Sequence, residues 1–284
     1  MEREINILVI DELTIEYSIV GEGTPILMFH GGHSNCYEEL GYTELVKQGF
    51  SLITPSRPGY GATSKEIGES LSNASKFYAQ LLNHLHIDKA HVVAVSAGGP
   101  SGISFAAHFP EHSLSLTLQS AVTKEWLTNK DKEYKAAQII FHPNVEKFTW
   151  KLVALINNYF PTFTFKRFIP SFSKLSSKDV MLQIDKESIE AVRKMNNHYR
   201  SGNGFLIDLV QVNQLSSTTQ AVACPTFIMH SKNDSAVPLE HAYFAHNNIE
   251  KAELCLLDSW GHLIWLGNKA SEVNKKVVSF LHRN

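Results

Sequence analysis

The chain has 284 residues, of which 43% are hydrophobic and 19% are charged, an ordinary composition for one large globular domain or a domain with a sizeable insertion. Its net charge of −2 argues against a broad basic surface for nucleic acid or an anionic membrane. No apolar run is long enough to span a bilayer, and the first residues lack a basic segment that leads into an apolar one. We therefore expect a cytoplasmic protein that binds neither nucleic acid nor a membrane, with its oligomeric state left open.

The order of predicted elements indicates the fold class. Period-2 apolar patterns over residues 5–10 and 13–20 predict a hairpin. Short apolar runs predict further strands over 26–29, 50–54, 91–95, 114–118, 226–229 and 252–257. Helical spacing of apolar residues predicts helices over 38–48, 72–86, 98–109 and 270–281. Strands that alternate with helices predict an α/β protein with a doubly wound, mostly parallel sheet of about eight strands.

The alternation is interrupted in the middle of the chain. Helical patterns over 126–141, 145–159, 186–198 and 205–215 follow one another with no strong strand between them. We therefore expect residues 1–122 and 221–284 to form the core and residues 123–220 to form an inserted helical cap. The cap segment has 14 Lys and Arg against 9 Asp and Glu, a net charge of +5.

The most informative motif is Val92-Val93-Ala94-Val95-Ser96-Ala97-Gly98-Gly99-Pro100, in which a buried strand runs directly into a helix. Such a sharp turn strains the backbone of its central residue, Ser96, and requires very small residues two positions before and after it. Ala94 and Gly98 meet this requirement, although Ala94 stands where the usual pattern has glycine. The motif predicts that Ser96 is a nucleophile.

With this motif and its element order, the chain resembles the α/β-hydrolase-fold superfamily over nearly its whole length. Within the superfamily it is most similar to capped serine hydrolases, in which a helical cap follows the sixth strand. The resemblance implies an oxyanion hole formed by the backbone N–H of Ala97 and that of Gly32 or His33, in the segment Phe29-His30-Gly31-Gly32-His33. His30 is expected to fix this loop by hydrogen bonding, and the Arg57-Pro-Gly-Tyr-Gly turn to be structural.

The same resemblance implies the other two members of a catalytic triad. Asp234 lies in Ser231-Lys-Asn-Asp-Ser-Ala-Val-Pro238 and matches the acid, while His262 lies after the last core strand and matches the base. The order Ser96, Asp234, His262 is the order that this fold uses. Asp258 is the alternative acid, but it lies close to His262 in the sequence.

The cap segment is rich in aromatic residues, and Trp126, Phe141, Trp150 and Phe163 are candidates to line an apolar pocket above Ser96. We expect no metal and no cofactor, because the three cysteines form no CxxC pair and no glycine-rich phosphate motif is present. The resulting hypothesis is a carboxylesterase that acts on small to medium apolar or aromatic acyl esters through an acyl-enzyme. A C–C bond hydrolase, an aminopeptidase or a cofactor-free perhydrolase with the same triad stays an alternative, as does a non-catalytic ligand-binding or signalling protein.

Overall fold

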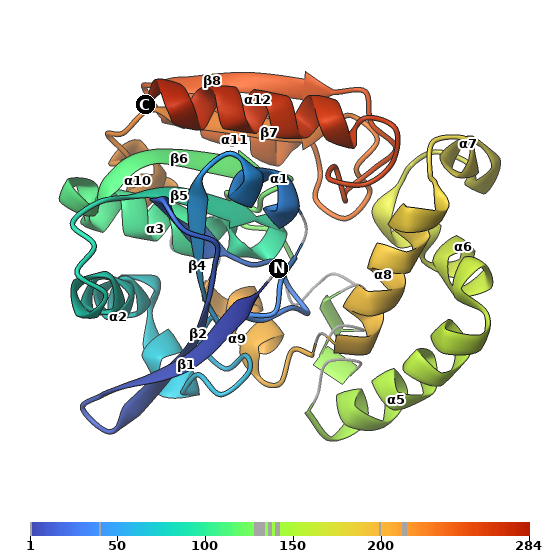
Figure 1. Cartoon of the computed structure of the whole chain (residues 1–284), viewed down its shortest axis with the longest axis horizontal. Coiled ribbons are helices and arrows are strands. Elements are labelled where there is room, and N and C mark those ends of the chain that lie inside the picture. Colours follow the sequence, from blue (N-terminus) through green and yellow to red (C-terminus); the bar gives the residue numbers. More distant parts are fainter. Residues whose placement is uncertain are drawn as a thin grey trace.

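The computed structural model describes residues 2–39, 41–127, 134–135, 138–139, 143–198, 200–211 and 215–284. The described residues form one sheet of eight strands in the order β1-β2-β4-β3-β5-β6-β7-β8. Its strands are β1 (Arg3–Ile10), β2 (Leu13–Val20), β3 (Thr24–Phe29), β4 (Phe50–Pro55), β5 (Ala90–Val95), β6 (Ser113–Gln119), β7 (Thr226–Ser231) and β8 (Ala252–Leu257). The pairs β1–β2 and β2–β4 are antiparallel, and all other pairs are parallel. The predicted doubly wound, mostly parallel sheet is confirmed (Figure 1).

Helices cover both faces of this sheet, as its apolar strands require. In β5 the side chains alternate: Val92 and Ala94 pack on one face, whereas Val93 and Val95 pack on the other. The first face is covered by α2 (Leu71–His84), α3 (Gly99–His108) and α11 (Glu240–Asn248), and the second by α1 (Tyr42–Lys47) and α12 (Ala270–Arg283). The central strands are therefore buried on both sides and hold the loops at their ends in fixed positions.

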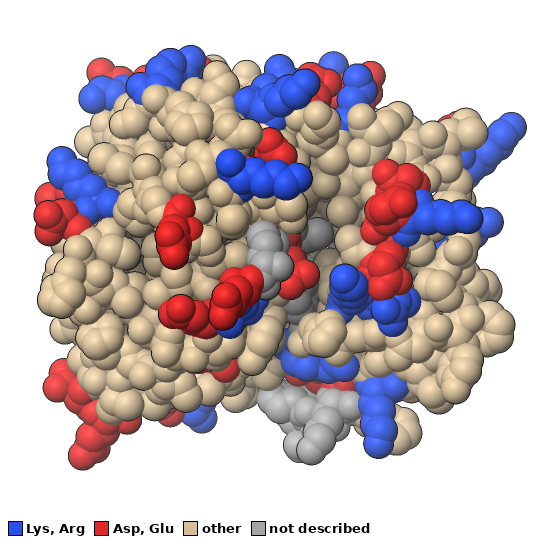
Figure 2. Space-filling view, viewed as in Figure 1, with Lys and Arg blue, Asp and Glu red and all other residues tan. Residues whose placement is uncertain are grey.

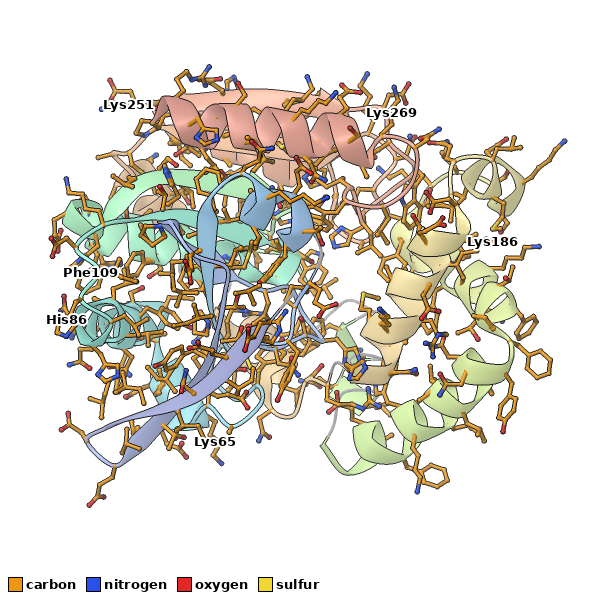
Figure 3. The ribbon with its side chains drawn as sticks, viewed as in Figure 1. Lys65, His86, Phe109, Lys186, Lys251 and Lys269 are labelled. Carbon is orange, nitrogen blue, oxygen red and sulfur yellow. The ribbon has the colours of Figure 1, made fainter. Side chains whose placement is uncertain are left out.

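A layer of helices follows the sixth strand and faces the carboxyl ends of the parallel strands (Figure 1). We call this layer the cap; it consists of α5 (Pro143–Tyr159), α6 (Pro161–Phe172), α7 (Ser177–Met181) and α8 (Lys186–His198). Helix α5 contacts both α6 and α8, and α6 contacts α7. In Figure 3, Lys186 at the start of α8 and Lys251 just before β8 lie on opposite sides of the molecule, so the strands run toward the cap.

The segment after the cap returns to the core. Helix α9 (Gly204–Gln211) contacts the short 3-10 helix Lys65–Glu69, and α10 (Leu215–Gln220) contacts α3 and α11. Leu215 packs into the same apolar cluster as the core helices. The last helices of the segment 123–220 therefore contact core elements as well.

Basic and acidic side chains are interspersed over the face of the molecule that Figure 2 shows. No helix in the described ranges combines the length and the apolar character that a membrane-spanning segment needs.

Candidate active site

Ser96 occupies the corner between β5 and α3, where the chain reverses sharply. Its φ is 52°, in the left-handed region that non-glycine residues rarely adopt. A Cβ on Gly98 would lie 2.5 Å from the carbonyl oxygens of Phe29 and His30, so only glycine fits at this position. The carbonyl of Ser96 accepts a hydrogen bond of 2.9 Å from the N–H of Val122, which holds the corner in place.

The structure explains how the corner tolerates Ala94. A Cβ on Gly102 in helix α3 would lie only 2.5 Å from the Cβ of Ala94, closer than two carbon atoms can approach. The methyl group that Ala94 adds to the strand therefore occupies space left by a glycine in the facing helix.

This arrangement predicts that Ala94→Gly, which is destabilising by itself, becomes stabilising when residue 102 is alanine. Gly102→Ala should lower the free energy of unfolding by about 1–3 kcal/mol, because the added methyl group clashes with Ala94. The double variant Ala94→Gly/Gly102→Ala should be more stable than Gly102→Ala alone, although Ala94→Gly by itself removes a methyl group from a buried strand. Urea unfolding of the four proteins measures this coupling, and losses that simply add would contradict it.

Three side chains from distant segments meet at the carboxyl end of the sheet. His262 Nε2 lies 2.9 Å from Ser96 Oγ, and His262 Nδ1 lies 2.7 Å from Asp234 Oδ2. Asp234 is completely buried and His262 is buried. Asp258, by contrast, is exposed. The structure therefore brings together the three residues expected from the sequence, in a geometry that can move a proton from a hydroxyl to an imidazole.

The environment of Asp234 favours its ionised form. Burial opposes ionisation most strongly, but the imidazoles of His262 and His230 outweigh burial, and the pKa of the Asp234 carboxyl lies below its ordinary value. Asp234 Oδ1 also accepts the N–H groups of Ala236 and Val237 at 2.8 and 2.9 Å. A carboxylate held in this way can fix the tautomer of the neighbouring imidazole.

The end of cap helix α6 contacts the loop that carries Asp234 and the loop that carries His262. The N–H of His262 donates to the carbonyl of Phe172 at 2.8 Å, and the two rings stack with centroids 6.2 Å apart. Ser173 forms an antiparallel β-bridge with Asp234. The cap thus directly contacts the loop that carries Asp234 and the loop that carries His262, and no pattern in the sequence indicates these contacts.

The loop after β3 passes beside the Ser96 corner. A Cβ on Gly31 would lie 3.3 Å from the Cβ of Ser96, and one on Gly32 would lie 3.4 Å from the Cβ of Ala97. His33 has a φ of 52°. The backbone of this loop and that of Ala97 therefore border the same space, where their N–H groups can stabilise negative charge on a carbonyl oxygen.

A buried charged network holds this loop. Arg57 Nε donates to the carbonyl of His30 at 2.9 Å, and its Nη2 donates both to the carbonyl of Gly31 at 3.1 Å and to Asp208 Oδ2 at 2.8 Å. Arg57 Nη1 pairs with the other oxygen of Asp208, and the hydroxyl of Tyr60 donates to Asp208 at 2.6 Å. Arg57 and Asp208 are both buried. The network ties the loop to helix α9.

His30 acts within this network as a neutral hydrogen-bonding residue. Burial and the nearby Arg57 hold the pKa of His30 well below its ordinary value. Its Nε2 accepts the backbone N–H of Arg57 at 3.0 Å, and its Nδ1 lies 2.8 Å from the carbonyl oxygen of Gly31. These contacts are those of a residue that fixes the loop, as expected from the sequence.

The side chain of His33 connects the loop to the cap. Its Nδ1 lies 2.9 Å from Ser201 Oγ and 3.2 Å from Glu146 Oε1, and its ring stacks on Trp150 with centroids 3.9 Å apart. Glu146 also accepts the N–H groups of Ser201 and Gly202. Burial opposes ionisation of Glu146, but the hydrogen bonds from His33 and from these N–H groups hold the pKa of Glu146 below its ordinary value.

A cavity of about 420 Å³ lies between Ser96 and the cap. Its lining is mostly apolar and comprises Gly31, Gly32, His33, Ser34, Glu38, Val95, Ser96, Trp150, Phe168, Ser171, Phe172, Met195, Asn196, Phe205, Ala236, His262, Leu263 and Trp265. Such a volume suits a small or medium organic ligand.

The four aromatic residues proposed for the pocket have different positions. Trp150 lines the cavity. Trp126 packs edge-to-face against Phe205 with ring centroids 6.1 Å apart and is not part of the lining. The expectation for Phe163 is wrong, because its side chain is 59% exposed on the outer side of α6. Phe141 lies outside the described residues.

With the fold and the geometry established, comparison with known proteins identifies the family. A family model described as the alpha/beta hydrolase fold matches residues 24–268, so the chain belongs to that family. It is similar to the uncharacterized hydrolase YcgS of Bacillus subtilis (strain 168), with 56% identity over 99% of both chains. It also resembles a 2-hydroxy-6-oxo-6-phenylhexa-2,4-dienoate hydrolase of Comamonas testosteroni, with 23% identity over 96% of this chain and 93% of that protein. The chain is also similar to the solved structure of an alpha/beta hydrolase fold protein from Nakamurella multipartita, with a TM-score of 0.85 and 24% identity. The match covers 98% of this chain and 99% of that chain.

Proposed function

We propose that this hydrolase is a carboxylesterase that cleaves small to medium, uncharged apolar or aromatic esters through an acyl-enzyme. The observation that carries the proposal is the continuous hydrogen-bonded chain from Ser96 through His262 to Asp234. His262 takes the proton of the Ser96 hydroxyl as its oxygen attacks the ester carbonyl, and then returns that proton to the leaving alcohol. A water molecule, deprotonated by the same imidazole, hydrolyses the acyl-enzyme and restores Ser96.

The oxyanion of each tetrahedral intermediate is assigned to the backbone N–H of Ala97 and to that of Gly32 or His33. The close approach of the loop to Ser96 and Ala97 supports this assignment. Each donor of this kind typically contributes ~10²–10³ in rate. Because the buried Arg57 holds the carbonyls of His30 and Gly31, the donors keep their positions without reorganising during the reaction.

The charge of the cavity supports an uncharged substrate. Among the residues that line it are the carboxylate of Glu38 and, in the described part of the chain, no Lys or Arg. An anionic substrate would thus meet the Glu38 side chain, and none of the described residues that line the cavity is a Lys or Arg that could pair with the anion. A C–C bond hydrolase is the second candidate, because the Comamonas testosteroni relative is named for a dienoate substrate, which is an anion. The lining favours the ester over such an anion.

A substrate panel separates these functions. We expect steady turnover of p-nitrophenyl esters, with kcat/KM falling once the acyl chain is too long for the cavity. A ring-cleavage dienoate and a proline arylamide, measured beside the esters, should be much poorer substrates. Preferential turnover of the dienoate would assign the protein to C–C bond hydrolysis. A single stoichiometric burst with no turnover of any compound would indicate a ligand-binding protein.

A further inference from the structure

The outer side of the cap carries a large apolar surface. We define the outer cap surface as the exposed apolar side chains of α5, of α6 and of the residue between them: Val145, Phe148, Leu152, Leu155, Ile156, Tyr159, Phe160 and Phe163. Phe148 is 76% exposed and Tyr159 is 74% exposed. The two helices form the outer edge of the cap in Figure 1, and aromatic side chains project from them away from the molecule in Figure 3. Contiguous exposed apolar surface of this kind marks a site of interaction with a protein or a membrane.

The sequence spacing makes this surface continuous along α5. Phe148, Leu152, Leu155 and Tyr159 recur at intervals of three and four residues, so they lie along one side of the helix. Other positions of α5 face inward, since Trp150 lines the cavity and Asn157 is buried. In α6, Phe165 and Ile169 pack into a core cluster, while Phe163 and the N-cap residue Phe160 stay exposed. Packing among the described residues therefore accounts for the inner side of these helices and not for the outer side.

The exposed charged side chains in the described parts of α5 and α6 are all basic. Lys151, Lys166 and Arg167 are exposed on the same two helices. The segment 143–172 contains a single carboxylate, Glu146, and this residue is buried and bound to His33 and to backbone N–H groups. The described surface of α5 and α6 thus combines large apolar and aromatic side chains with cations and presents no exposed carboxylate.

We propose that the outer cap surface binds anionic phospholipid bilayers. Apolar and aromatic side chains enter the boundary between headgroups and acyl chains, and flanking Lys and Arg are attracted to anionic headgroups. Association of two copies through the same surface would place cations opposite cations, which opposes a dimer at this site. The chain's net charge of −2 does not predict such binding, because it averages over acidic residues elsewhere.

The position of the surface gives the binding a function. Helices α5 and α6 also contribute Trp150, Phe168 and Phe172 to the cavity, so a cap lying on a bilayer would bring the cavity close to apolar esters dissolved in it. This consequence rests on the proposed esterase activity, whereas the lipid binding does not.

Co-sedimentation of the full chain with vesicles tests the proposal. We expect binding to vesicles of equimolar phosphatidylcholine and phosphatidylglycerol, and much weaker binding to phosphatidylcholine alone. The variant Phe148→Glu/Tyr159→Glu should reduce binding at least tenfold, because it removes two aromatic groups that would enter the bilayer and adds negative charge. The variant Lys151→Gln/Lys166→Gln should reduce binding by roughly fivefold for each cation removed, with a weaker dependence on phosphatidylglycerol.

The control is Val9→Glu, which replaces a residue of similar exposure on strand β1, far from the cap in the sequence. Its binding should equal that of the original protein. Because all of these side chains are exposed, circular dichroism should show unchanged folding in every variant. No sedimentation with either vesicle, or a dimer in solution that Phe148→Glu/Tyr159→Glu dissociates, would overturn the proposal.

Discussion

Replacing Ser96 with Ala should lower kcat/KM for a p-nitrophenyl ester by roughly 10⁴-fold or more, with little change in stability. Without the hydroxyl, His262 has no proton to take and no acyl-enzyme can form. The remaining activity would come from substrate binding and the backbone donors near Ala97, which do not depend on the side chain of residue 96. Steady-state kinetics and thermal unfolding measure the two effects.

The matched control is Ser171→Ala, which removes the hydroxyl of another serine in the lining of the same cavity. This variant should keep activity within a few-fold of the original protein, since Ser171 is not hydrogen-bonded to His262 in the described contacts. Equal losses in both variants would indicate that the cavity, and not the Ser96 hydroxyl, limits the reaction.

Replacing Asp208 with Leu should lower the free energy of unfolding by about 3–5 kcal/mol, the usual cost of removing one partner from a buried ion pair. Arg57 would keep its charge in a site where it is 1% exposed, and the hydroxyl of Tyr60 would lose its acceptor. Because Arg57 also holds the carbonyls of His30 and Gly31, we expect activity to fall as well. Urea unfolding and ester kinetics measure these losses.

Two further proteins make this experiment specific. Asp258→Leu removes an exposed carboxylate and should change stability by no more than about 0.5 kcal/mol. The double variant Arg57→Met/Asp208→Leu should be more stable than Asp208→Leu alone, because it leaves no unpaired buried charge. If Asp208→Leu unfolds at the same urea concentration as the original protein, the buried pair does not hold the loop as described.

Much of the core could be predicted from the sequence because its signals are local. Two strands follow alternating apolar patterns and six follow short apolar runs, and all eight lie where these patterns predict them. The turn at Ser96 could also be predicted from local sequence, since its backbone conformation restricts nearby residues to very small ones. The acid and the base could be predicted only through the family resemblance, because nothing local in the sequence distinguishes His262 from the other histidines.

Other parts of the site depend on contacts between distant segments. Asp208 lies 151 positions after Arg57, and no pattern near either residue indicates the pair. Phe172 supports His262 mainly through its backbone carbonyl, which any residue type could supply. The cap aromatics illustrate the same limit, since Trp150 faces the cavity while Phe163 faces outward, and both helices carry apolar residues on more than one side.

The identity of the residue modified by a fluorophosphonate probe tests the proposed mechanism most directly. Intact-mass and peptide mass spectrometry should locate a single label on the Ser96 hydroxyl, and Ser96→Ala should abolish labelling while the protein stays folded. A label at another residue, or labelling that survives Ser96→Ala, would contradict the role assigned to the Ser96, His262 and Asp234 cluster.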